Sequence, residues 1–142
     1  MIAKYKVKID EHSTCRTRMH VHVKERKICK WHPKSSLRCT FDLLHEIGHI
    51  EANKSGMRRA EEEYSATCWA IDRFKEYGLE VTDSILHIYQ RYVYSEVARG
   101  KRRGGTGYAE LNLYKYTGKD KTVEQFKKEL APDWARMIND WI

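Results

Sequence analysis

The first 38 residues alternate between apolar and polar positions, with the period of two that is typical of β-strands. The alternation is clearest in residues 4–10 and 18–30. Ile28 and Trp31 are candidates for a third strand. Because one face of each segment is apolar and the other is polar, we predict a small antiparallel sheet that is covered on one side.

Beyond Arg38 the apolar residues recur every three to four positions, which is the period of an α-helix. This spacing predicts helices over three segments, 40–54, 59–77 and 84–99. Thr40 is the predicted N-cap of the first helix, and Gly78 and Gly100 are the predicted ends of the second and third.

The last third of the chain has a weaker pattern. Glycines interleaved with the basic run Lys101–Arg103 predict a flexible basic loop over residues 100–107. A short strand or loop and two short helices are predicted to follow, at 108–116, 122–130 and 133–141. Strands that precede helices without βαβ alternation predict an α+β fold.

The length of 142 residues corresponds to one compact domain, and a second full domain would not fit. We therefore expect a single domain with three parts: strands mainly in 1–38, the principal helices in 39–100, and the basic loop with the C-terminal helices in 101–142. A hydrophobic fraction of 41% and a charged fraction of 33% are ordinary for a globular protein.

The net charge of +7 is unevenly distributed along the chain. Residues 1–40 hold 11 Lys and Arg against 3 Asp and Glu, whereas residues 41–100 hold 7 against 11. Residues 101–142 are again basic, with 9 against 6. Basic ends of this kind either attract nucleic acid or an acidic protein, or form solvated faces.

The N-terminus alternates charged and apolar residues, which differs from the continuous apolar core of a signal peptide. No apolar run approaches the roughly 20 residues that span a bilayer, so we expect no membrane association and a cytoplasmic location. Four cysteines lack any Cys-x-x-Cys pair, which predicts free thiols rather than a zinc ribbon; they are Cys15, Cys29, Cys39 and Cys68.

The motif His45-Glu46-Ile47-Gly48-His49 is the strongest chemical signal. Two histidines four residues apart on a helix project from one face and can share one zinc ion. Glu46 lies about 100° around the helix from His45, where it can act as a general base without binding the metal. Composition predicts roughly 0.03 such matches by chance, so the surrounding residues decide what the motif means.

A catalytic zinc needs a third protein ligand, and the next predicted helix begins with Glu61-Glu62-Glu63. Glu63 shares a helix face with the small residues Ala66 and Ala70, which would allow close approach to the first helix. Gly48 would serve the same purpose from the other side. Glu63 is therefore our predicted ligand, with Glu62 as the second choice.

The run from Arg38 to His49 resembles the active helix of the ImmA/IrrE-type metallopeptidases. The third ligand of that family is a Glu in the pattern Glu-x-x-Ala-x-x-aromatic-Ala, and residues 63–70 match it. The resemblance implies a Zn²⁺ held by His45, His49 and Glu63, with Glu46 as the catalytic base of a peptidase. SprT-type proteases have a similar helix motif, but the Glu63 pattern fits the first family better.

The same resemblance implies a protein substrate. Members of this family are often encoded by phages or mobile elements, and they act on repressors of the helix-turn-helix class. A helix-turn-helix repressor is therefore the expected partner of this chain.

Two other classes of protein remain open. Within the peptidase hypothesis, a variant is a DNA-associated protease that residues 1–40 and Lys101–Arg103 bring to nucleic acid. From another class, the chain could be a basic nucleic-acid-binding or regulatory domain with a structural or vestigial metal site. No helix-turn-helix, zinc-finger or RNP signature supports this alternative. The second is a non-catalytic interaction protein held in shape by zinc. His20 and His22 share the polar face of a predicted strand and are expected to be exposed.

Overall fold

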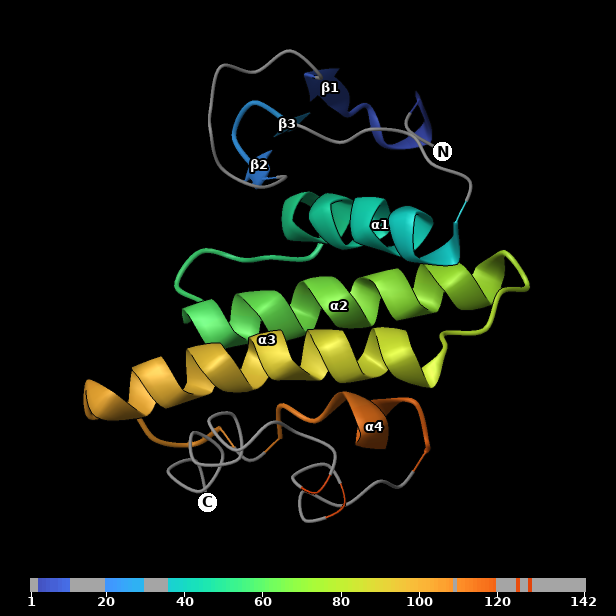
Figure 1. Cartoon of the computed structure of the whole chain (residues 1–142). Coiled ribbons are helices and arrows are strands. Elements are labelled where there is room, and N and C mark those ends of the chain that lie inside the picture. The colour runs from blue at the N-terminus through green and yellow to red at the C-terminus, as the bar shows by residue number, and fades with distance from the viewer. Residues whose placement is uncertain are drawn as a thin grey trace. The chain divides into compact units, whose positions relative to one another are not determined.

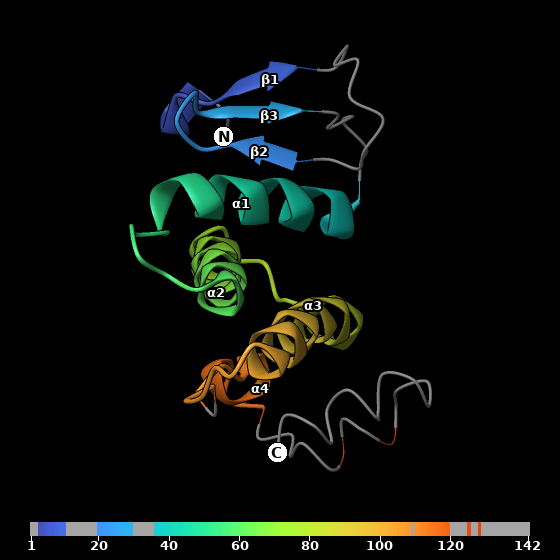
Figure 2. The same cartoon turned by 90° about the vertical axis from the view of Figure 1, so that its left-hand side faces the viewer.

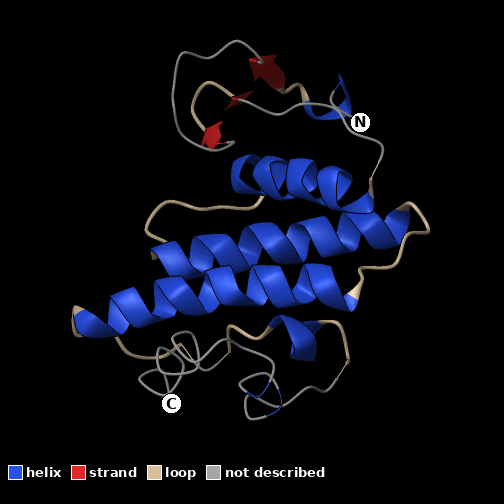
Figure 3. Cartoon of the chain, viewed as in Figure 1, coloured by secondary structure: helices blue, strands red, loops and turns tan. Residues whose placement is uncertain are grey.

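The structure is a computed structural model that describes residues 3–10, 20–29, 36–108, 110–119, 125 and 128. Its elements in chain order are η1 (Ala3–Tyr5), β1 (Lys8–Asp10), β2 (His20–His22), β3 (Lys27–Cys29), α1 (Leu37–Glu51), α2 (Arg59–Glu76), α3 (Asp83–Arg102) and α4 (Leu113–Tyr116) (Figure 1). The mixed content of helices and strands confirms the predicted α+β class (Figure 3). The helices predicted at 122–130 and 133–141 lie outside the described residues, except that residues 125 and 128 are helical.

The chain divides into two compact units. The first comprises Met1–Ser55 and Ser65–Leu79, and the second comprises Gly56–Tyr64 and Glu80–Ile142. One continuous helix, α2, contributes residues to both units. The single-domain organisation stays a prediction.

The sheet of the first unit has the strand order β1-β3-β2 (Figure 2). β2 pairs with β3 in antiparallel fashion, with Val21 opposite Ile28. β1 pairs with β3 in parallel, with Ile9 also opposite Ile28. The sheet is therefore mixed, and the prediction of an antiparallel sheet is wrong for β1. Alternation of apolar and polar residues reports which face of a strand is buried, but it carries no information on strand direction.

The segment 18–30, predicted as one strand with a third beginning near Ile28, forms a hairpin over its described residues. The turn ends at Arg26, whose N–H donates to the carbonyl of Val23 over 3.1 Å. Arg26 adopts φ of 49°, a left-handed conformation that a glycine would ordinarily provide. The turn contains no glycine, asparagine or proline, so its residues carry no recognisable turn signal.

Helix α1 is covered on two sides within the first unit (Figures 1 and 2). Leu43 and Ile47 pack with Val7 and Ile28 in a buried cluster beneath the sheet. On the side of α2, the ring of Phe41 meets that of Phe74 edge to face, with centroids 5.1 Å apart. This burial on both sides explains the strongly apolar composition of α1, and it fixes the helix in place.

The start of α1 differs from the prediction. Ser36 is the N-cap, and its hydroxyl oxygen accepts the N–H of Cys39 over 3.1 Å. Thr40, the predicted N-cap, lies inside the helix, where its hydroxyl donates to the carbonyl of Ser36. Both residues are good N-caps, and the apolar period alone did not show that the first turn begins at Leu37.

Helices α1 and α2 approach closely at Gly48. A Cβ atom added at this position would lie 2.5 Å from the carbonyl oxygen of Ala66 and 3.0 Å from its Cα. The obstructing atoms are backbone, so they cannot turn aside as a side chain can. Gly48 therefore sets the spacing of the two helices, as its small size predicted.

Replacing Gly48 with alanine is expected to lower the free energy of unfolding by about 1–3 kcal/mol, the usual cost of overpacking a core. The direction is opposite to that of an ordinary glycine-to-alanine change inside a helix, which stabilises by about 0.5–1 kcal/mol. Urea unfolding followed by circular dichroism measures the difference. A variant as stable as the wild type would contradict the close backbone contact.

The second unit is organised around α3. Thr82 caps this helix by accepting the N–H of Ile85. The buried side chain of Gln90 donates to the carbonyl of Leu111 over 3.1 Å and accepts the N–H of Leu113 over 2.6 Å. The segment predicted as a strand or loop at 108–116 thus contains a short helix, α4, held by this glutamine.

The predicted end of α3 at Gly100 is wrong, because the helix continues to Arg102. A Cβ at Gly100 would lie 2.1 Å from the hydroxyl oxygen of Tyr108. This glycine therefore provides room for a tyrosine ring and does not end the helix. Gly78, with φ of 70°, does follow the end of α2, as predicted.

A search of the described residues for membrane spans finds no helix that combines the length and the apolar character needed to cross a bilayer.

Candidate metal centre

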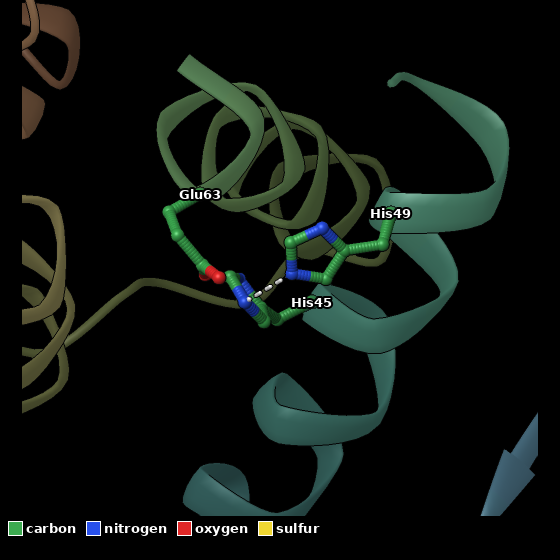
Figure 4. A group of neighbouring side chains, drawn as sticks. All are labelled: His45, His49 and Glu63. Carbon is green, nitrogen blue, oxygen red and sulfur yellow. Dashed lines mark hydrogen bonds between the residues drawn. The ribbon is translucent and has the colours of Figure 1, made fainter. Parts of the chain in front are cut away.

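The two histidines of the motif lie on α1, one helical turn apart, and both are 4% exposed. Their Nε2 atoms face each other at 3.1 Å. The ring planes are nearly perpendicular, at 86°. Figure 4 shows both rings directed toward the same point. Histidines on the outer face of a surface helix would be exposed, and these two are not. Buried polar atoms need hydrogen-bond partners, so each ring nitrogen requires one.

The three consecutive glutamates at the start of α2 have different environments. Glu61 accepts the main-chain N–H of Arg58 over 3.0 Å and its guanidinium Nε–H over 2.8 Å, so it closes the first turn of the helix. Glu62 pairs with Arg59 over 3.3 Å. Glu63 alone among the three is buried, with 8% exposure. All three residues are glutamates, and Glu63 differs from the other two because it lies on the buried face of the helix.

His45, His49 and Glu63 come together in one buried group (Figure 4). Each offers one potential ligand atom, and these atoms all lie within 4.8 Å of one another. Within the described part of the chain, no second group of three or more His, Cys, Asp and Glu side chains lies close enough together to hold a metal. The structure thus brings together the three residues that the sequence pattern selected.

The position of Glu63 follows from the packing of α2 one turn further along. Ala66 and Thr67 lie three and four residues after Glu63, on the same helix face. Ala66 contacts Gly48, and the hydroxyl of Thr67 lies 3.0 Å from Nδ1 of His45. Because α2 is continuous, these contacts direct the carboxylate of Glu63 toward the rings.

The outer ring nitrogens of both histidines have hydrogen-bond partners that the sequence did not indicate. Nδ1 of His45 faces the hydroxyl of Thr67, and Nδ1 of His49 lies 2.8 Å from Nδ2 of Asn53. Partners at the outer nitrogen fix the orientation of a ligating imidazole. Asn53 lies four residues after His49, so helical spacing was the one signal that could have suggested it.

Charge at the group is balanced by arginine. The exposed guanidinium of Arg59 lies 2.7 Å from Oε1 of Glu63, which compensates a carboxylate that is otherwise costly to bury. The neighbouring Arg58 acts on Glu61 instead. Its main-chain N–H and its guanidinium hold the pKa of the Glu61 carboxyl below the usual value. These hydrogen bonds from Arg58 therefore favour the ionised form of Glu61.

Glu46, the predicted base, is partly buried in α1 beside His45. It is not a member of the ligand group, although its neighbour His45 is. This placement agrees with a residue that lies next to a metal site without contributing a ligand.

The remaining predicted residues lie elsewhere. His22 is exposed on β2. Cys39 and Cys68 are free thiols, as predicted, and Cys15 lies outside the described residues. In the basic run Lys101–Arg103, the first two residues complete α3 and the third is its C-cap.

Comparison of the chain with protein-family models, with curated proteins and with solved structures finds no match. The chemistry of the group itself is therefore the basis for a functional proposal.

Proposed function

We propose that this chain is a zinc-dependent peptidase that hydrolyses a peptide bond in a protein substrate. The observation that carries the proposal is the buried group of His45, His49 and Glu63. Two imidazoles and one glutamate form the ligand set of several catalytic zinc sites, in which a fourth position stays open for water or substrate. Structural zinc sites, in contrast, are usually closed by four protein ligands.

The separation of the two histidines fits this ion. Two nitrogens that each lie about 2.0–2.1 Å from a tetrahedral zinc are about 3.3–3.4 Å apart. The Nε2 atoms of His45 and His49 are 3.1 Å apart. Glu63 is buried and pairs with the exposed guanidinium of Arg59, so its carboxylate lies where a positive charge is favoured.

Zinc bound by these residues would supply Lewis-acid chemistry, since the ion polarises a peptide carbonyl and lowers the pKa of a coordinated water to about 7. Glu46 is the residue of this chain that we assign as general base. It neighbours His45 but projects about 100° around the helix, so its carboxylate is available to take a proton from the attacking water. The same carboxyl would then donate the proton to the leaving amine.

The likeness of residues 38–49 and 63–70 to the ImmA/IrrE-type metallopeptidases supports the same proposal. We extend it to the substrate, for which that likeness points to a repressor of the helix-turn-helix class. Association with nucleic acid through the basic N-terminal residues and Lys101–Arg103 stays a prediction.

Metal analysis of the purified protein tests the proposal directly. We expect about one zinc per chain and metal-dependent cleavage of a degenerate peptide library, read by mass spectrometry. Cobalt substitution tests the open position, because acetohydroxamate should change the visible spectrum of a cobalt ion that has a free coordination site. Bound iron in place of zinc would contradict the metal assignment, since two histidines and one carboxylate also bind Fe(II).

Two outcomes would favour the alternatives. Zinc with a cobalt spectrum that acetohydroxamate leaves unchanged indicates a fourth protein ligand and a structural site. Metal-independent DNA binding that weakens steeply with salt, without any cleavage, indicates a basic nucleic-acid-binding domain.

The choice between neighbouring glutamates gives a matched pair of variants. Glu63→Gln is expected to weaken zinc binding by well over 10-fold, because an uncharged amide replaces a carboxylate ligand. Glu62→Gln is expected to change it by less than about 3-fold, because an exposed pair with Arg59 contributes little. Competition with a fluorescent chelator measures both affinities, and the reverse order would identify Glu62 as the ligand.

A further inference from the structure

Asn53 stands just beyond the end of α1, and its side-chain amide has one hydrogen bond, to His49. Nδ2 of the amide lies 2.8 Å from Nδ1 of His49. The other amide atom, Oδ1, is buried and has no hydrogen-bond partner within the described part of the chain. A buried acceptor left without a donor destabilises the folded state, so this arrangement calls for an explanation.

The orientation of the amide determines the tautomer of His49. An amide N–H that donates to Nδ1 requires that Nδ1 carries a lone pair and that Nε2 carries the hydrogen. Nε2–H of His49 can then donate to Nε2 of His45, 3.1 Å away, and Nδ1–H of His45 can donate to the hydroxyl of Thr67. In a metal-free protein, hydrogen bonds thereby link Asn53, His49, His45 and Thr67 in one continuous series.

A metal ligand needs the opposite tautomer. Nε2 of His49 must present its lone pair to the ion, so the hydrogen must lie on Nδ1, and Nδ1 must then face an acceptor. A half-turn of the Asn53 amide brings Oδ1 to the place of Nδ2. Because Oδ1 has no partner to lose, the rotation breaks no bond of the oxygen. Nδ1 of His45 already faces a hydroxyl that can accept, and it needs no such change.

We propose that Asn53 is a positioning residue that supports both tautomers of His49, donating from its amide nitrogen in the metal-free protein and accepting with its amide oxygen once the ion is bound. The inference rests on the proposed metal site and deepens it. An asparagine suits this task because it offers a donor and an acceptor at interchangeable positions. Aspartate offers only acceptors, and alanine offers neither.

The test compares Asn53→Asp with Asn53→Ala in the full chain, with zinc affinity measured by chelator competition. Alanine is expected to weaken zinc binding by about 10- to 100-fold, the usual effect of removing such a partner. Aspartate is expected to restore the affinity to within about 3-fold of the wild type or above it, because its carboxylate accepts the Nδ1 hydrogen. Circular dichroism melts check that both variants fold.

A second measurement reports the tautomer itself. Long-range ¹H–¹⁵N spectra of the imidazoles should place the His49 hydrogen on Nε2 in the metal-free wild type and on Nδ1 in the zinc-loaded protein. In metal-free Asn53→Asp the hydrogen should already lie on Nδ1. Glu51→Gln serves as the control, since Glu51 is an exposed residue of α1 that pairs with Arg26, and its replacement should leave the His49 tautomer unchanged.

Failure of this inference is distinguishable from failure of the proposed function. A wild-type protein that binds no zinc overturns both. A wild-type protein that binds zinc overturns the inference alone under any of three results: alanine binds as tightly as asparagine, aspartate is as weak as alanine, or the His49 hydrogen stays on Nε2 when zinc is bound.

Discussion

Replacement of Glu46 by glutamine is expected to leave zinc bound and to lower the rate of peptide-bond cleavage by about 10²–10⁴-fold, the usual contribution of a general base. Glutamine has nearly the shape of glutamate but cannot take up a proton in this role. Zinc content should be unchanged because Glu46 is not part of the ligand group. The measurement is the turnover of the best library peptide, with zinc quantified in the same sample.

Glu51→Gln is the matched control for this change. Glu51 is an exposed residue of the same helix that pairs with Arg26, and it is not in the metal-site group. Its variant should cleave at close to the wild-type rate. Cleavage by Glu46→Gln at that same rate would remove Glu46 from the mechanism and leave the metal site without its predicted base.

Replacement of His45 by alanine is expected to lower zinc affinity by more than the roughly 100-fold that loss of an outer partner costs. The reason is that a ligand is removed outright and only His49 and Glu63 remain. Cleavage should disappear together with the metal. Zinc content after dialysis against a weak chelator measures the effect.

His22→Ala provides the comparison, since His22 is exposed on β2 and is not in the group. This variant should retain about one zinc per chain. Retention of full zinc by His45→Ala would refute the ligand assignment, whatever the cleavage assay shows.

The helical part of the fold was predictable because its signals are local. A period of 3.6 residues places His45 and His49 on one face, and the same period selects Glu63 over Glu62 through the small residues that follow it. The structure brings these three side chains together from two consecutive helices. No long-range pairing had to be deduced for that grouping.

The sheet and the termini of the helices were less predictable, for different reasons. The parallel pairing of β1 with β3 is a long-range choice that leaves no mark on the alternation within either strand. Glycine most often ends a helix, so the sequence predicts an end at Gly100, whereas in the structure this glycine accommodates the ring of Tyr108. In both cases the determining contact is tertiary: β1 pairs with a strand that begins at Lys27, and Gly100 meets the ring of Tyr108, which lies beyond the end of α3.

The hydrogen-bond partners of the two Nδ1 atoms could not be predicted from the sequence either. Thr67 shared the face of Glu63, yet whether its hydroxyl reaches a ring nitrogen depends on the orientation of His45. Asn53 has the four-residue spacing of a partner for His49, yet it lies beyond the helix end, where that spacing alone does not determine the direction of a side chain. Such hydrogen-bond partners can be identified only when the atomic positions are known.

The backbone contact between Gly48 and Ala66 has a consequence for how the protein responds to metal supply. Because the two main chains already touch there, the helices cannot come closer together, and this contact sets the shortest distance across the group of His45, His49 and Glu63. If zinc binds only the folded protein, free zinc at 100 times the dissociation constant adds about 2.7 kcal/mol of stability. A shortage of zinc would then lower the stability of the folded chain as well as its metal-dependent activity.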